Sequence, residues 1–299
     1  MSLALIIHGG AKTMSPEELE PHREGVRRAA EIGWAVLKRG GSAVDAVEAA
    51  VRAMEDDPVF NAGLGSELNA EGEVQMDAAI MEGAELDAGA VGFIQGVRHP
   101  ISVARRLLTE KEVLMTGDGA RCFAVKHDLE VCAKEALVTP ERRKKWEERQ
   151  GGENNTVGAV ALDANGLIAA GASTGGTGGN PRGRVADTGS IGSGVYAEND
   201  RGGAAMTGDG EAILRLALAK TAVDRMGEQD PDAVAAQLVD RLERRVQGEG
   251  GCALLDARGR VGWHHNSGHM AVAYITETDP TVRAFVQKSE EGAKWPVGR

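Results

Sequence analysis

The stretch TVGAVALDANGLIAAGAST, residues 156–174, decides the fold. Two apolar runs flank Asn165-Gly166, a dipeptide that favours the two-residue type I′ turn of a β-hairpin. The runs are apolar at successive positions rather than at alternate ones, which is typical of strands that are covered on both faces. The sequence therefore predicts a buried hairpin with further layers above and below it.

The register of this hairpin brings two threonines together. If the turn has two residues, Thr156 lies opposite Gly175 and Val157 lies opposite Thr174. A one-residue change in the loop would instead put Thr156 directly across from Thr174. Opposite and diagonal partners on adjacent strands lie within several ångströms of each other, so both registers make the two threonines close neighbours.

The remaining segments predict the layers around the hairpin. Ser15-Pro16-Glu17-Glu18 combines an N-cap serine, a proline at the first helical position and a capping-box glutamate, and opens a helix expected to end near Lys38. Each half has two helices and then strands, which predicts an α+β fold, a four-layer αββα sandwich with helices outside two stacked sheets. Further helices are expected at 42–57, 100–109, 118–124, 211–226 and 230–246, and further strands at 3–7, 73–81, 113–116, 251–256, 260–263 and 271–275.

Residues 134–155 form a charged, weakly apolar segment that closes with GGENN. This composition is typical of an exposed linker, and exposed linkers are preferred sites of cleavage. The one basic run, Arg142–Lys145, is followed at once by Glu147 and Glu148, so it is predicted to be a solvated helix face.

Composition excludes several classes of protein. The 299 residues carry a formal charge of −11, which argues against a nucleic-acid partner because such binding depends on clustered Lys and Arg. No segment approaches the roughly 20 apolar residues of a membrane span, and the N-terminus lacks the regions of a signal peptide. Three cysteines without paired spacing fit a reducing compartment. We therefore expect a cytoplasmic protein that binds neither nucleic acid nor membrane.

Thr156 combines an unusual position with a specific chemistry. A threonine that starts a buried strand is usually just a good strand former, but here the linker ends one residue earlier and Thr174 returns beside it. A threonine hydroxyl is a weak nucleophile until a base takes its proton. Cleavage of the Asn155–Thr156 bond would free an α-amino group with a pKa of about 7.7–8.0, well below that of lysine, so Thr156 would carry its own base.

At this point the chain resembles a known family, the plant-type or type 2 L-asparaginases, also called isoaspartyl peptidases, which are N-terminal-nucleophile (Ntn) hydrolases. The resemblance runs nearly from end to end, in the family's order and spacing. The motifs that carry it are IIHGGA at 6–11, GGSAVDAVEAAV at 40–51, PVFNAGLGSELNAEGEVQMDAAIMEG at 58–83, TVGAVALD at 156–163, STGG at 173–176, GRVAD at 183–187, TGDGE at 207–211 and NSGHM at 266–270.

The resemblance implies what the protein does. It implies hydrolysis of L-asparagine to aspartate and ammonia, and cleavage of isoaspartyl dipeptides. It also implies that the single domain 1–299 first cuts itself into 1–155, whose last part is the linker 134–155, and 156–299. Thr156 matches the nucleophile and Thr174 the second threonine beside it.

The other matching positions hold substrate or stabilise charge. Arg184 matches the residue that grips the substrate's α-carboxylate, and Asp187 matches the acceptor of its α-ammonium. The remaining matches are Thr207 and Gly208 for the oxyanion hole, Gly210 for a further backbone contact, and Asn61 for orienting the nucleophile.

The family also implies an ion and an assembly. A structural sodium ion would be bound by backbone carbonyls, and no catalytic cofactor is implied. The expected assembly is a dimer of cleaved heterodimers, that is, a heterotetramer. The carbonyls belong to Met54, Glu55, Asp57, Phe60, Ala62 and Leu64.

Some positions depart from the family pattern. Asn155 stands where Gly or Asp is common, which affects the rate of self-cleavage, and VADTG at 185–189 replaces VGDSP, which affects the choice between asparagine and isoaspartyl dipeptides. The alternatives are a glycosylasparaginase or a Thr-type endopeptidase on the same fold, and an uncleaved, catalytically silent ligand-binding homologue. A zinc site at His264, His265 and His269 is disfavoured, because no further ligand lies at suitable spacing.

Overall fold

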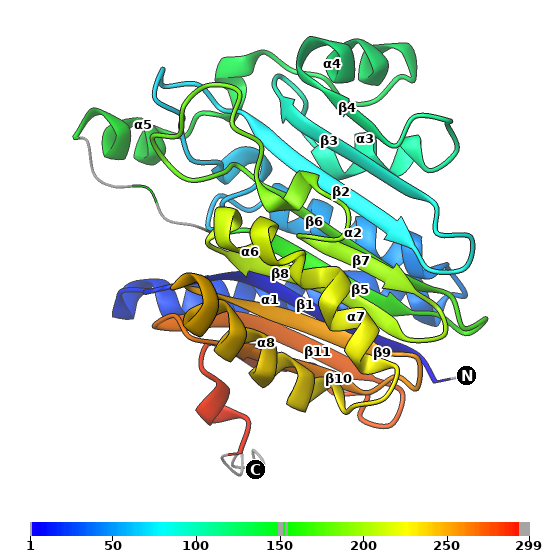
Figure 1. Ribbon diagram of the computed structural model, residues 1–299. Helices are drawn as coiled ribbons and strands as arrows, with labels where there is room; N and C mark the ends of the chain where they lie inside the picture. The colour runs from blue at the N-terminus through cyan, green and yellow to red at the C-terminus, as the bar shows by residue number, and fades with distance from the viewer. Residues whose placement is uncertain (1, 149–151, 153–154, 293–299) are drawn as a thin grey trace.

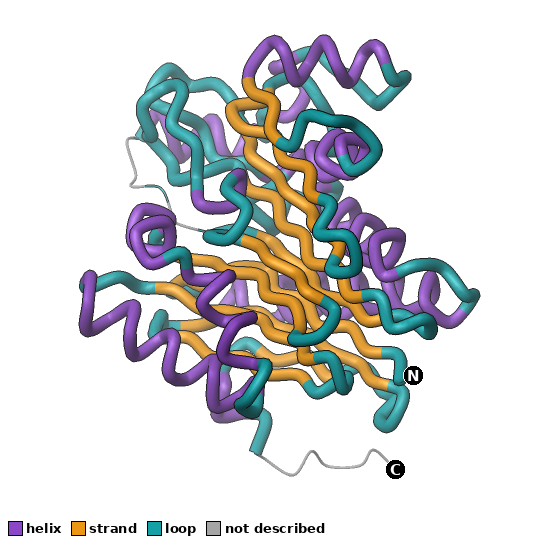
Figure 2. Tube along the Cα trace, turned by 45° about the vertical axis from the view of Figure 1, so that its right-hand side comes forward, coloured by secondary structure: helices purple, strands orange, loops and turns teal. Residues whose placement is uncertain are grey.

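The computed structural model describes residues 2–148, 152 and 155–292. Within these residues, strands form a sheet of eight in the order β12-β11-β1-β5-β6-β2-β3-β4 and a sheet of four in the order β10-β9-β8-β7. Figures 1 and 2 show the two sheets stacked, with helices on their outer faces. The predicted four-layer αββα sandwich is confirmed.

The element bounds follow the sequence signals closely. Ser15 forms the expected capping box with Glu18. The helices are α1 (Pro16–Lys38), α2 (Ala43–Glu55), α3 (Pro100–Leu107), α4 (Gly117–Lys126), α5 (Pro140–Glu147), α6 (Gly210–Leu216), α7 (Leu218–Met226) and α8 (Pro231–Val246). The strands are β1 (Ala4–Lys12), β2 (Met76–Glu82), β3 (Ala88–Ile94), β4 (Leu114–Thr116), β5 (Val157–Leu162), β6 (Ile168–Thr174), β7 (Val195–Glu198), β8 (Gly202–Gly208), β9 (Gly250–Asp256), β10 (Val261–His265), β11 (His269–Thr276) and β12 (Arg283–Phe285).

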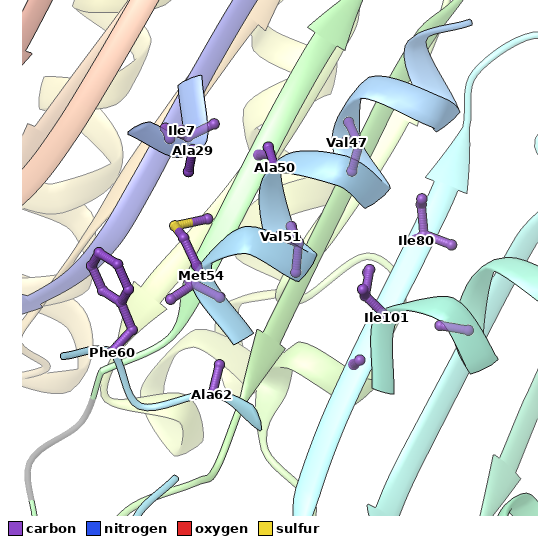
Figure 3. Packing of buried hydrophobic residues seen from close by; sticks show 14 of the residues in the cluster. Ile7, Ala29, Val47, Ala50, Val51, Met54, Phe60, Ala62, Ile80 and Ile101 are labelled. Atoms are coloured by element: carbon purple, nitrogen blue, oxygen red, sulfur yellow. The ribbon is translucent and has the colours of Figure 1, made fainter. Parts of the chain in front are cut away.

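Three hydrophobic clusters separate the layers. Successive side chains of a strand point to opposite faces, so Leu5 and Ile7 of β1 pack under helices α1–α3 while Ala4 and Ile6 pack between the two sheets. Figure 3 shows part of the outer cluster, where side chains from these helices pack on one face of the larger sheet. A third cluster joins the smaller sheet to α7 and α8. Both faces of the central strands are therefore buried, as their unbroken apolar runs predict.

Five residues, 163–167, connect the last paired residues of the hairpin, so the two-residue turn predicted for Asn165-Gly166 is wrong. The paired residues run from Val157 opposite Ser173 to Leu162 opposite Ile168. The Oδ1 atom of buried Asp163 accepts the N–H groups of Asn165 (2.8 Å) and Leu167 (3.1 Å), and these bonds hold the wider loop.

The wider loop sets the position of the two threonines. Continuing the observed register by one residue puts Thr156 directly across from Thr174. Of the two registers considered from the sequence, this is the second, in which the loop differs by one residue from a two-residue turn.

Residues 211–226 form two helices rather than the single predicted one. Ala217 adopts the left-handed conformation, with φ of 47°, and ends α6. The next turn is redirected because Ala219 N and Lys220 N donate to the carbonyls of Ser193 (3.1 Å) and Gly192 (2.8 Å). These bonds depend on residues distant in the sequence, so periodicity alone could not show the break.

The described part of the segment 134–155 is less exposed than its composition predicts. It contains α5, and the side chain of Arg142 on this helix is buried. Its Nε donates to Gly65 O at 2.9 Å and its Nη1 pairs with Glu67. Lys144 of the same run is 75% exposed. The predicted solvated face is therefore wrong for Arg142, because its carboxylate partner lies in the first part of the chain.

Across the described ranges, helices are too short or too polar to cross a bilayer.

Candidate active site

Thr156 lies between the two sheets, at the point where β5 begins. The residue is 4% exposed. Its backbone N–H donates to Thr207 Oγ1 on β8 at 3.3 Å, and its own Oγ1 lies 3.4 Å from Thr188 Oγ1. Ala11 N–H also donates to Thr207 Oγ1, at 3.2 Å. The three hydroxyl groups thus converge from β5, β8 and the loop before β7.

The loop after β6 links Thr174 to Asn61. Thr174 Oγ1 accepts the N–H of Gly176 at 3.1 Å. Asn61 Nδ2 donates to Gly176 O at 2.6 Å, and Asn61 O accepts the N–H of Gly175 at 2.9 Å. Asn61 thus fixes the loop beside the threonine pair, and its described hydrogen bonds go to that loop and to Glu67 N.

Gly208 follows Thr207 directly on β8 and has a backbone that requires glycine. Its φ is +128°, and a Cβ atom there would run into the carbonyl of Glu249 and the Cα of Gly250 on β9. The Thr207 hydroxyl and the Gly208 N–H are therefore carried by a closely paired, rigid strand end, which suits an oxyanion hole.

The side chains of Arg184 and Asp187 both lie close to Gly210. A Cβ atom on Gly210 would lie 2.8 Å from Asp187 Oδ1 and 2.9 Å from Arg184 Nη2. Arg184 uses its Nε and Nη2 to bind the two carboxylate oxygens of Glu211, at 2.9 and 2.8 Å. The predicted pair is brought together, and Glu211 is a third member that the sequence did not indicate.

Asp187 is a buried carboxyl group that lacks a partner on one side. Burial raises its pKa to about 7, although the nearby Arg184 charge opposes this. Its Oδ2 has no hydrogen-bond partner among the described residues. A buried polar atom without a partner is rare and marks a place where a ligand can complete the bonding. An ammonium group is the complementary ligand here.

Asp77 on β2 was missed as a site residue, although it is an acidic residue near the start of a mostly apolar strand. It is buried, and burial raises its pKa to about 6. Its Oδ2 accepts the N–H of Ala186 at 2.7 Å and its Oδ1 accepts that of Phe93 at 2.8 Å. Asp77 therefore fixes the backbone next to Asp187. Thr188 was also missed, although it lies in the VADTG stretch.

The residue before Thr156 is held in a narrow space. Asn155 is 2% exposed, and its side chain lies against Gly10, whose φ is +102°. His8, two residues earlier on β1, is fully buried, and burial lowers its pKa to about 3. The imidazole ring of His8 is therefore neutral, so it adds no positive charge near the Asn155–Thr156 bond.

The loop after α2 folds back closely on the end of that helix. A Cβ atom on Gly63 would run into the carbonyl of Glu55, and one on Gly65 would run into that of Phe60. Figure 3 shows Phe60 and Ala62 beside Met54 at the end of α2. Two of the six carbonyls predicted to bind sodium, those of Glu55 and Phe60, thus lie in close contact with glycines of this loop, and the sodium site stays a prediction.

The zinc site considered for His264, His265 and His269 does not form among the described side chains. Among the described residues, which include His264, His265 and His269, there is no group of three or more His, Cys, Asp or Glu side chains that could hold a metal ion.

Comparison with known proteins supports the relationship suggested by the motifs. The asparaginase family profile matches residues 1–155 and 147–283. The chain is 43% identical to a plant-type L-asparaginase of Pyrococcus abyssi over 301 aligned residues, covering 92% of this chain and 97% of the relative. It is 40% identical to the isoaspartyl peptidase/L-asparaginase of Bos taurus, covering 91% and 94% of the two chains. The mouse protein of the same name is 43% identical, covering 87% and 83%. The chain therefore belongs to the asparaginase family that contains the plant-type L-asparaginases and isoaspartyl peptidases.

Proposed function

We propose that this protein cuts itself between Asn155 and Thr156 and then hydrolyses L-asparagine and isoaspartyl dipeptides, with Thr156 as the nucleophile. The observation that carries the proposal is the convergence of Thr156 with Thr207 and Thr188 beside a buried, half-partnered Asp187. The names of the relatives from Pyrococcus abyssi and Bos taurus support both substrates.

In the first stage Thr156 attacks the bond that precedes it. Its Oγ1 adds to the carbonyl carbon of Asn155, the C–N bond to Thr156 breaks, and the proton of the hydroxyl ends on the departing nitrogen. Water then hydrolyses the resulting ester. The products are a carboxylate on Asn155 and a free α-amino group on Thr156.

In the second stage the freed amine takes the proton of Thr156 Oγ1, which attacks the side-chain carbonyl of the substrate. The Thr207 hydroxyl and the Gly208 N–H bind the oxyanion, and removal of one such donor typically costs on the order of 10²–10³ in rate. The amine returns its proton to the leaving ammonia or amino acid. Water then hydrolyses the β-aspartyl ester and releases aspartate.

Substrate recognition follows from the charges of the site. Glu211 binds the Nε and Nη2 edge of the Arg184 guanidinium. The Nη1 side of the guanidinium can therefore bind a substrate carboxylate. Asp187 Oδ2 is left for an α-ammonium. A planar guanidinium suits a carboxylate better than a lysine ammonium does. The site therefore selects an amino-acid head group with both charges.

We further propose the ion, the assembly and the compartment. The carbonyls of the 54–64 loop would bind a structural sodium ion, the cleaved chains would form a dimer of heterodimers, and the protein would work in the cytoplasm without a nucleic-acid or membrane partner. The three free cysteines Cys122, Cys132 and Cys252 support a reducing compartment.

The test is the intact mass of purified protein, fresh and after incubation at neutral pH, together with release of ammonia from L-asparagine. Wild type is expected to give fragments that end at Asn155 and begin at Thr156. Thr156→Ala is expected to stay whole and inactive, because it lacks the hydroxyl that both stages use. Hydrolysis by Thr156→Ala would refute the assignment.

The same assay separates the alternatives. A glycosylasparaginase would need a glycan on the asparagine substrate, and a Thr-type endopeptidase would cleave internal peptide bonds instead. A silent binding homologue would stay uncut and inactive as wild type.

A further inference from the structure

Thr188 is the side chain that contacts the hydroxyl oxygen of Thr156. The two Oγ1 atoms lie 3.4 Å apart, with Thr188 0% exposed and Thr156 4% exposed. Within the described parts of the chain, this is the only hydrogen-bond contact of the Thr188 hydroxyl. A buried hydroxyl group normally has a hydrogen-bond partner, and here that partner is the proposed nucleophile.

The other two threonines of the site use their hydroxyl oxygens differently. Thr174 Oγ1 accepts the N–H of Gly176 at 3.1 Å. Thr207 Oγ1 accepts the backbone N–H of Thr156 at 3.3 Å. Neither bond involves Thr156 Oγ1. The structure thus brings Thr188 to the reacting oxygen, rather than the threonine directly across the hairpin.

The short 3-10 turn that carries Thr188, Asp187–Gly189, is held in place by the chain that follows it. Asp187 O accepts the N–H groups of Ser190 at 2.9 Å and of Gly194 at 3.1 Å. Gly194 packs so closely on the turn that a Cβ atom there would lie 2.7 Å from Thr188 Cα. The Thr188 hydroxyl is therefore positioned before any reaction begins, which lowers the cost of reorganisation.

We propose that Thr188 is a catalytic residue whose hydroxyl donates a hydrogen bond to Thr156 Oγ1 whenever that oxygen gains negative charge. The inference rests on the proposed function, in which Thr156 is the nucleophile. Thr188 keeps its own proton throughout.

The direction of this bond follows from the proton transfers. When the amine of Thr156 takes the hydroxyl proton, Oγ1 has no hydrogen left and can only accept. Thr188 still has its hydroxyl hydrogen and therefore donates. Oγ1 then forms a C–O bond with the carbonyl carbon of the substrate. A hydrogen bond to an oxygen that bears charge is roughly twice as strong as one between neutral groups.

The same bond assists release of the product. Water adds to the carbonyl carbon of the ester while the amine of Thr156 takes a proton from the water. The C–O bond to Thr156 Oγ1 then breaks, and the amine gives that proton to the departing oxygen. Thr188 donates to Oγ1 while its negative charge develops.

Thr188 and Asp187 are neighbours with different roles under this proposal. Asp187 binds the substrate's α-ammonium group, whereas Thr188 acts on the reacting oxygen. Loss of the Thr188 hydroxyl should therefore lower kcat and leave KM almost unchanged. Self-cleavage should slow as well, because it uses the same Thr156 oxygen.

The test compares Thr188→Val with Thr188→Ser. Valine has almost the shape of threonine, so at a fully buried position it leaves no room for water to replace the hydroxyl. Thr188→Val is expected to cut itself at least tenfold more slowly and to have a kcat for L-asparagine at least tenfold lower, with KM within threefold. Thr188→Ser keeps the hydroxyl and should stay within threefold of wild type in all three quantities.

Intact mass gives the cut fraction, and ammonia release gives kcat and KM per cut chain. The matched control is Ser193→Ala, which removes a hydroxyl group from a residue that is 8% exposed in the same loop. It is expected to cut and turn over at the wild-type rate. Thermal unfolding should show that Thr188→Val is folded.

A second pair of variants decides the question if Thr188→Val fails to fold or cuts too little for kcat to be measured. Thr188→Ala and Thr188→Ser both lack the methyl group, and only the serine variant has a hydroxyl. Self-cleavage at least tenfold faster in the serine variant supports the proposal, and equal rates refute it.

The remaining outcomes separate this inference from the proposed function. If wild type cuts and hydrolyses asparagine while Thr188→Val keeps both rates, or changes KM alone, the role of Thr188 is refuted and the proposed function stands. Thr188→Ser as slow as Thr188→Val, or Ser193→Ala equally slow, would also refute it. If wild type neither cuts nor hydrolyses asparagine, the proposed function fails and takes this inference with it.

Discussion

At the residue scale, the part of the site proposed to bind the substrate has more acidic than basic side chains. Asp77, Asp187 and Glu211 surround the single guanidinium of Arg184, and the first two are fully buried. Three carboxyl groups thus lie near one guanidinium group. An incoming α-ammonium group would correct this imbalance, which explains why a free amino group on the substrate should matter as much as its carboxylate.

The raised pKa of Asp187 predicts how substrate binding depends on pH. Below its pKa of about 7 the carboxyl group is mostly protonated and cannot pair with an α-ammonium as an anion. Above it, the group is ionised and binds. The KM for L-asparagine is therefore expected to fall as pH rises from 6 to 8, measured from initial rates at each pH.

The control for this prediction is Asp187→Asn. Loss of a hydrogen bond to a charged group costs about 1.5–3 kcal/mol, so KM should rise more than tenfold. The fall in KM between pH 6 and 8 should also disappear. A KM in this variant that still falls with pH would assign the titration to another group.

At the scale of elements, the β5–β6 hairpin and α2 share one carboxylate. Asp163 Oδ1 closes the loop, while its Oδ2 accepts the N–H of Ala43 in the first turn of α2 at 3.0 Å. The side chain is 2% exposed. One residue thus sets both the register that aligns Thr156 with Thr174 and the start of the helix packed on that hairpin.

Asp163→Ala is expected to destabilise the protein. It leaves three backbone N–H groups without their acceptor, which should cost about 2–5 kcal/mol in the free energy of unfolding. Urea denaturation measures the loss. Asp163→Asn keeps one acceptor oxygen and should lose less, so equal losses in both variants would show that the acceptor is not what matters.

The hairpin also shows what the sequence could and could not predict. Apolar runs, caps and turn residues placed most of the helices and strands, because these signals act over a few residues. Strands β3, β7, β8 and β12 were not predicted. The break at Ala217 and the burial of Arg142 were missed, because each depends on a partner distant in the sequence. The wider hairpin loop was missed although the bonds from Asp163 to Asn165 and Leu167 that hold it are local. In the site, the family motifs indicated Arg184, Asp187 and Thr207, whereas Asp77 and Glu211 emerged only from hydrogen bonds that the fold creates.

At the scale of the whole molecule, the two sides of the proposed cut are interleaved. Strand β1, from the first half, pairs with β5 on one edge and with β11 on the other, and both partners come from the second half. Strands β2 and β3 extend the same sheet beyond β6. Cutting one bond before β5 removes none of these pairings.

The cut protein is therefore expected to stay in one piece. Native mass spectrometry should show both fragments together, and a denaturing gel should show them apart. Gel filtration then tests whether two such units associate. Fragments that separate without denaturant would contradict the pairing of β1 with β5 and β11.

If the chain is cut as proposed, the central place of β1 between β5 and β11 makes unfolding hard to reverse. Before the cut, refolding is a first-order event, since every strand is tethered to its neighbours. Afterwards, a molecule that has lost its structure must find its missing half by collision, and β1 must be inserted between two strands of another chain. Recovery then depends on concentration and competes with aggregation, so the working lifetime of the mature enzyme is set by how slowly it unfolds.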